Sequence, residues 1–216
     1  MSTKFKTIWT MGFALVVFGL YGSSIIRAQP AAETQSQPPA VIQYKGDMAN
    51  MLAHLPSIYG RTIGLELDVR QQRSTVEFYL KDPTLVDVLN ALTKSAPIYR
   101  WSDREDSIEV VPLKGGTPLL DTRVSSFRVD YADESEAITQ LLNLPEVQAS
   151  MDAMKLRQNS TNAFAAGSGK KMSFAVHDVT VRQVLNKIAN ENGSRFWILT
   201  RNSAGFFSIR TVRIIG

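Results

Sequence analysis

Two short stretches carry residue types that catalyse reactions or bind cations. His177 stands directly before Asp178, and residues 103–106 are an aspartate, an arginine, a glutamate and an aspartate. A histidine oriented by an aspartate is a general base. Neighbouring residues of a strand point to opposite faces, however, so these two side chains do not form a dyad. We expect His177 on the surface and, because an arginine interrupts the acidic run, a solvated hairpin tip at residues 103–106.

Other signatures of catalysis and of cofactor binding are incomplete. The segment GSGKK resembles a phosphate-binding loop, but that pattern requires a glycine at Phe164 and a serine or threonine at Lys171. The chain has no cysteine and only two histidines, His54 and His177, so a zinc site would need mostly carboxylate ligands. We predict no catalytic residue, no metal ligand and no cofactor, and therefore a protein that is not an enzyme.

The N-terminus has the pattern of an export signal. Lys4 and Lys6 precede residues 8–26, which carry no charge, and small residues lead to a cleavage point after Ala28. The pattern predicts a signal peptide over residues 1–28 and an exported protein, either periplasmic or associated with the outer membrane. The alternative is an inner-membrane anchor formed by residues 8–26, because this uncharged stretch is just long enough to span a bilayer.

The charge argues against a nucleic-acid-binding protein. The chain carries 24 basic and 20 acidic residues, a net charge of +4. Three of the basic residues lie in the leader, which has no acidic residue, so 21 basic residues face 20 acidic ones in the rest. Nucleic-acid binding needs a clustered basic face, and the sequence has none. Membrane contact is expected only through the N-terminal segment, if that segment is retained.

One stretch of the chain occurs twice. FYLKDPTLVDVLNAL, residues 78–92, is similar to FAVHDVTVRQVLNKI, residues 174–188, and Trp101 and Trp197 keep the same offset of 96 residues. In both copies alternating apolar residues predict a half-buried strand. A threonine with an aspartate or glutamine three positions later predicts the capped start of a helix. Apolar residues at helical spacing then predict one buried face on that helix.

Each half also begins with a strand and a helix and ends with two further strands. One helix is expected from Met48 to Leu55, and another after Asp133. The strand expected over residues 62–69 has no counterpart in the second half, where residues 145–156 look helical. The predicted fold class is α+β, with two related small domains, each a small antiparallel or mixed sheet with two packed helices.

The predicted domain boundaries follow breaks in composition. A flexible linker is expected at residues 29–40, which are polar and contain several prolines. The first domain is expected over residues 41–113 and the second over residues 119–216, separated by the segment KGGTP. The second domain contains a polar loop at residues 157–171.

Residues 41–112 resemble the short N-terminal domain of secretins and of TonB-dependent transporters that signal. The resemblance is carried by YKGDMANML, by IGLELDV, and by VEFYLKDPTLVDVLNAL followed by YRW and IEVVP. Residues 172–211 resemble the second half of the same domain, as a partial and degenerate copy. This domain normally precedes a channel or barrel, and the resemblance implies docking to other proteins of a secretion, pilus or transport system.

The resemblance implies a non-catalytic binding or assembly module of the bacterial cell envelope, with another envelope protein as its partner. An exposed strand edge accepts a partner strand, which makes the last strand a candidate contact: Ile209, Arg210, Thr211, Val212 and Arg213. Trp101 and Trp197 are candidate aromatic contacts, against the competing expectation that each packs on its own helix. Two alternatives remain: a binder of a small ligand or polymer, and a hydrolase with a cleft between the two halves.

Overall fold

The structure is a computed structural model that describes residues 40–68, 75–159 and 170–212. The order of its elements is β1 (Val41–Asp47), α1 (Met48–Tyr59), β2 (Thr62–Asp68), β3 (Thr75–Lys81), α2 (Leu85–Ser95), β4 (Tyr99–Asp103), β5 (Ser107–Pro112), the short 3-10 helix η2 (Pro118–Asp121), β6 (Arg123–Ala132), α3 (Glu134–Leu142), α4 (Pro145–Ala153), β7 (Arg157–Gln158), β8 (Met172–Thr180), α5 (Val181–Asn192), β9 (Phe196–Arg201) and β10 (Phe206–Thr211). The predicted α+β class is confirmed. The predicted leader over residues 1–28 lies outside the described residues.

Strands from both halves of the chain build one six-stranded sheet in the order β4-β5-β2-β9-β10-β7. The halves meet where β2 and β9 pair in parallel, a contact that we call the repeat junction. The prediction of two domains with separate sheets is not confirmed, because the described residues belong to one compact unit and share this sheet. The reason is that β2 and β9 each leave one edge unpaired within their own half, and the two edges pair with each other.

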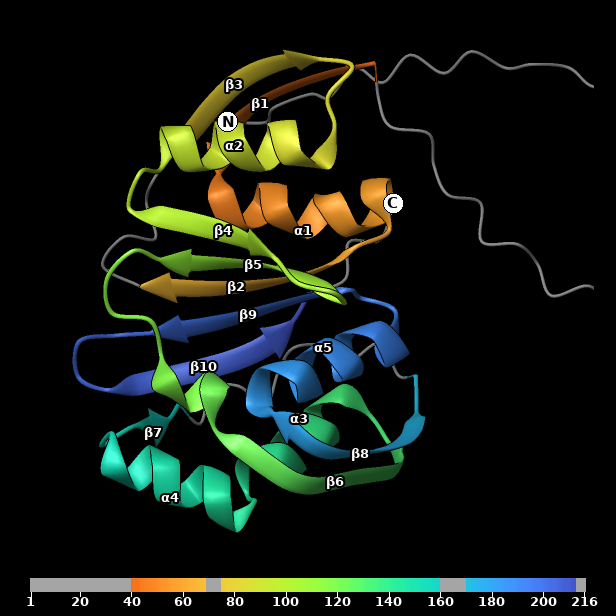
Figure 1. Ribbon diagram of the computed structural model, residues 1–216, viewed down its shortest axis with the longest axis vertical. Coiled ribbons are helices and arrows are strands. Elements are labelled where there is room, and N and C mark those ends of the chain that lie inside the picture. The colour runs from red at the N-terminus through yellow and green to blue at the C-terminus, as the bar shows by residue number, and fades with distance from the viewer. Residues whose placement is uncertain (1–39, 69–74, 160–169, 213–216) are drawn as a thin grey trace, which may run out of the picture. The chain divides into compact units, whose positions relative to one another are not determined.

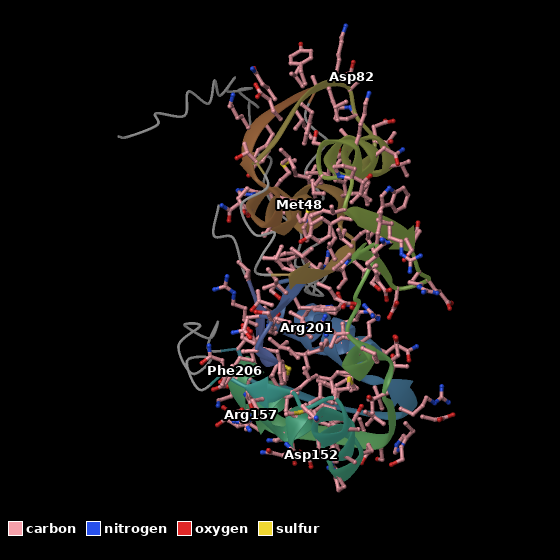
Figure 2. All side chains as sticks on the ribbon, turned by 90° about the vertical axis from the view of Figure 1, so that its left-hand side faces the viewer. Met48, Asp82, Asp152, Arg157, Arg201 and Phe206 are labelled. Atoms are coloured by element: carbon pink, nitrogen blue, oxygen red, sulfur yellow. The ribbon has the colours of Figure 1, made fainter. Side chains whose placement is uncertain are left out.

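The two halves have the same topology. In the first half β4, β5 and β2 are neighbours, with β1 and β3 as a separate antiparallel pair; in the second half β9, β10 and β7 are neighbours, with β6 and β8 as the pair. The counterpart of β2 is β7, a two-residue strand in the stretch that we expected to be loop. Figure 2 labels Phe206 and Arg157, the residue pair at which β10 and β7 begin their parallel pairing.

Local sequence explains where the repeated helices begin. The hydroxyls of Thr84 and Thr180 each accept a hydrogen bond from the backbone three residues on, and the side chain at that position bonds back to the threonine amide. These are the two predicted capping boxes. Asp82 and Asp178, at the same offset of 96 residues, both have positive φ, a conformation that aspartate tolerates better than most residues. The chain therefore turns in the same way before both helices.

The six-stranded sheet is covered on opposite faces in its two halves. Figure 1 shows α1 and α2 between the sheet and the β1–β3 pair, and α3 and α5 between the sheet and the β6–β8 pair. The core divides accordingly. Phe196 and Ile198 of β9 belong to the hydrophobic cluster of the first half, and Trp197 and Leu199 belong to that of the second. Side chains alternate along a strand, so β9 contributes to both clusters.

Candidate functional site

Both repeated tryptophans are held by an asparagine of their own half. Trp101 Nε1 donates to Asn90 Oδ1 at 3.0 Å, and Trp197 Nε1 donates to Asn186 Oδ1 at 2.7 Å. Trp197 is fully buried, which removes it as an aromatic contact for a partner and supports the expectation that it packs on its own helix. Trp101 is half-buried. The repeat thus places one tryptophan in the core and leaves its counterpart within reach of solvent.

A buried ionic cluster lies at the repeat junction. The guanidinium of Arg182 in α5 contacts Glu66 Oε1 at 3.0 Å and Glu109 Oε1 at 3.3 Å, and both glutamates are almost completely buried. Glu66 Oε2 accepts a further hydrogen bond from the Thr117 amide at 2.7 Å. Buried charges are retained when they are paired and hydrogen-bonded. The cluster therefore joins α5 of the second half to β2 and β5 of the first.

Burial controls the protonation of one member of this cluster. Desolvation raises the pKa of Glu109 above its ordinary value, although the neighbouring Arg182 and Arg104 act in the opposite direction. Glu109 is therefore a carboxyl group that the fold tolerates more easily in its neutral form. It is not paired with a nucleophile or a histidine among the contacts described for it, so we assign it no catalytic role.

A cleft between the halves was required by the hydrolase and small-ligand hypotheses. The cavity at the junction, lined by residues that include Glu66, Thr117 and Arg201, has a volume of about 10 Å³. That space holds about one water molecule. Side chains of both halves therefore fill this part of the junction, and it offers no room for a substrate.

The last strand is covered by another strand only at its start, because β7 pairs with Phe206 and Phe207 alone. β10 lies between β9 and β7, and the amide of Thr211 donates to Glu134 Oε1 at 2.8 Å. Ile209 and Thr211 are buried, Arg210 is exposed and Val212 is half-buried, while Arg213 lies outside the described residues. The pairing with β7 ends before Ile209, so the assignment of residues 209–213 as a partner edge stays a prediction.

The other polar residues lie where the sequence placed them. His54 and His177 are exposed. Residues 104–106 form the turn between β4 and β5. In the described part of the chain, no group of three or more histidine and acidic side chains is arranged to hold a metal ion. Within the same residues, no helix is both long enough and apolar enough to cross a membrane.

An open groove of about 790 Å³ runs between β3 and α2. Phe78 and Leu80 of β3 are half-buried and, with Ala91 of α2, give the groove apolar surface. Figure 1 shows α2 running beneath the β1–β3 pair, and Figure 2 shows Asp82, which follows β3, at one end of the described residues. An apolar groove beside an exposed strand is a shape that accepts an extended peptide.

The backbone of β3 has polar groups available along this groove. In an antiparallel pair, residues that bond to the partner strand alternate with residues whose amide and carbonyl groups point away. The Asp82 amide donates to the Ala40 carbonyl at 2.7 Å. The even-numbered residues of β3 are therefore the ones whose backbone groups bond to β1. Tyr79 and Lys81 therefore direct their backbone groups outward. Within the described residues no hydrogen bond is made to these groups, whereas the Glu77 carbonyl accepts one from Ser95 Oγ at 3.3 Å.

At the corresponding place in the second half a lysine lies beside the aromatic ring. Lys187 occupies the position of Ala91 at the offset of 96 residues, and its ammonium group lies 5.9 Å from the centre of the Phe174 ring. Phe174 is the counterpart of Phe78. A lysine stem packs along apolar surface and its charge is attracted to an aromatic face. Ala91 is too short to pack along Phe78 in this way, although Phe78 and Phe174 are both half-buried.

Two lysines border the open groove without an ion pair among the described residues. Lys81 and Lys94 are exposed and line it, whereas Glu77 is bound to Lys45 at 2.8 Å and Asp87 serves in the capping box of α2. The hydrogen bonds from Thr84 hold the pKa of Asp87 below its ordinary value. The unpaired charges at the groove are therefore positive, which favours an acidic ligand.

Sequence reasoning did not identify this groove. The repeat aligns Ala91 with Lys187, and this difference in side-chain size was the one sign of the groove in the sequence. The sequence does not show, however, which face of α2 lies beside β3. The chain matches no protein-family model, no curated protein and no solved structure. The resemblance to the N-terminal domain of secretins and transporters therefore stays a prediction.

Proposed function

We propose that this chain is a non-catalytic protein-binding module of the bacterial cell envelope. Its groove between β3 and α2 takes an extended, acidic segment of another envelope protein. The observation that carries the proposal is the outward-facing backbone of Tyr79 and Lys81 beside the half-buried Phe78. The export signal predicted at residues 1–28 and the resemblance to an envelope docking domain support the compartment and the kind of partner.

The bound segment adds a strand to β3. Main-chain hydrogen bonds to Tyr79 and Lys81 supply affinity without regard to sequence, and pockets for alternate side chains supply specificity. Every second side chain of the segment rests on Phe78, Leu80 and Ala91, and is apolar. Acidic residues near the ends of the segment lie beside Lys81 and Lys94.

A display library of random heptapeptides, panned against the full chain and against two variants, tests the proposal. Ala91→Lys brings the second half's lysine into the groove to cover Phe78. Ala204→Lys adds the same side chain at an exposed position in the β9–β10 turn. The wild type and Ala204→Lys should select peptides with alternating apolar residues and acidic flanks, and Ala91→Lys should lose that selection.

Selection of the same peptides by Ala91→Lys would show that they bind elsewhere and would overturn the assignment of the groove. Selection of no peptide by a wild type that is shown to be folded would count against a protein-binding function. The cell-envelope compartment is tested separately by fractionating cells that make the tagged full chain, where recovery from the cytoplasm would contradict it.

A further inference from the structure

The outer edge of β4 is the counterpart of the edge by which β9 accepts β2. In the repeat junction Trp197 of β9 lies opposite Gly64 of β2, in parallel register. Trp101 of β4 occupies the same place in the first half, with the same bond from its indole to an asparagine. β4 is the terminal strand of the six-stranded sheet, so no strand of the described residues pairs with its outer edge.

The backbone of β4 directs polar groups out from this edge. Arg104 and Ser107 exchange two backbone hydrogen bonds, at 2.8 Å and 3.4 Å. The even-numbered residues of β4 are therefore the ones whose backbone groups bond to β5. Trp101 and Asp103 therefore turn their amide and carbonyl groups outward. The equivalent residues of β9, Trp197 and Leu199, pair with β2. β4 thus offers to another strand the positions that β9 uses inside the chain.

The difference in burial between the two tryptophans indicates which residue a docked strand needs opposite Trp101. Trp197 is fully buried because its ring lies on Gly64, where a Cβ atom would overlap the ring carbons Cζ2 and Cε2. Trp101 is half-buried. A strand that covers Trp101 in the same manner must have a glycine opposite it, since a larger residue meets the indole.

The opposite face of β4 sets a second requirement. In the junction the residue before the glycine, Ile63, lies opposite Phe196, and both are buried. The position of Phe196 is occupied in β4 by Arg100, which is exposed and has no ion pair among the described residues. A residue that precedes the glycine of a docked strand lies beside this guanidinium. An acidic side chain there forms the pair that Arg100 lacks.

We propose that the outer edge of β4 is a second docking site, which takes in parallel an extended partner segment with an acidic residue followed by a glycine. The site uses a different sheet from the groove at β3 and does not depend on that groove. It extends the six-stranded sheet as β9 and β2 extend each other across the junction. The protein then has two strand-accepting edges with different sequence preferences.

The test uses three capped heptapeptides, Thr-Thr-Glu-Gly-Thr-Thr-Thr and its versions with valine in place of the glycine or lysine in place of the glutamate. Threonine suits an extended strand. Binding to the ¹⁵N-labelled full chain is followed through the Trp101 indole and the backbone amides of Trp101 and Asp103. The first peptide should shift these signals saturably, and both altered peptides should bind at least about tenfold more weakly.

Three variants locate the effect. Arg100→Glu should reverse the preference, so that the lysine peptide binds more tightly than the glutamate peptide, while Arg210→Glu, another exposed strand arginine, should leave it unchanged. Ala91→Lys should also leave it unchanged, which separates this site from the groove. Equal binding of the glycine and valine peptides, or no saturable shift at Trp101, overturns the proposal whatever the outcome for the groove.

Discussion

The indole ring of Trp197 lies directly against the backbone of Gly64, across the parallel pairing of β9 and β2. This contact joins residues that are far apart in the sequence and belong to different halves of the chain. Beside it, Asn186 receives the indole hydrogen bond and donates to Ser107 Oγ at 2.8 Å. Close packing and buried hydrogen bonds therefore stabilise the pairing of the two halves in one sheet.

Gly64→Ala should destabilise the protein by about 1–3 kcal/mol, because the added methyl group overlaps the Trp197 ring and forces a shift in a packed core. Gly116→Ala is the matched control, since its Cβ would meet Glu66 Oε2 only at 3.8 Å, an ordinary contact. Urea unfolding of the variants measures both effects. Equal stabilities of the two variants would refute the role assigned to this contact.

Arg182→Ala should lower the free energy of unfolding by about 3–5 kcal/mol, because it leaves Glu66 buried without its cation and Glu109 with only the exposed Arg104 at 3.6 Å. Adding Glu66→Gln and Glu109→Gln to Arg182→Ala should restore part of the loss, since the uncompensated charges are then removed. Thermal unfolding of the single and triple variants checks the prediction. A triple variant less stable than Arg182→Ala alone would contradict it.

Asn186→Ala and Asn90→Ala form a matched pair across the repeat. Asn186→Ala leaves the buried Trp197 indole without its acceptor and should cost about 1–3 kcal/mol. Asn90 is exposed and its partner Trp101 is half-buried, so water replaces the lost bond and the cost should stay within about 0.5 kcal/mol. Chemical denaturation measures the free energy of unfolding of both variants. A larger loss of stability for Asn90→Ala would contradict the assignment of Trp197 as the tryptophan that depends on its asparagine.

The raised pKa of Glu109 predicts a definite pH dependence. Its folded-state pKa lies above the ordinary value of 4.5, so the stabilisation from the protonated form is complete below that value and is lost as pH rises through the folded-state pKa. Glu109→Gln lacks this titration. The stability of the variant relative to wild type should therefore rise as pH increases from the ordinary value of 4.5 through the folded-state pKa.

Urea unfolding across that range measures the difference, with Glu105→Gln, an exposed position, as the control that should show no such trend. A relative stability of Glu109→Gln that falls as pH rises would mean that Arg182 outweighs burial at this carboxyl group.

Local patterns in the sequence predicted the elements that repeat. Thr84 and Thr180 marked the helix starts because a side-chain cap needs only neighbouring residues. Alternating apolar residues marked β3 and β8 for the same reason. The two-residue strand β7 was missed, because a strand this short has no periodicity and forms only where β10 already lies beside it.

The sequence by itself determined the α+β class, the repeated strand-and-helix unit and the surface position of His54 and His177, since these follow from short-range periodicity and capping. The tertiary structure alone decided that β2 and β9 share a sheet, that Trp197 is fully buried while Trp101 is half-buried, and that a groove lies between β3 and α2. Those outcomes depend on which sheet edges meet, and edge pairing between distant strands leaves no periodic signal in a single chain.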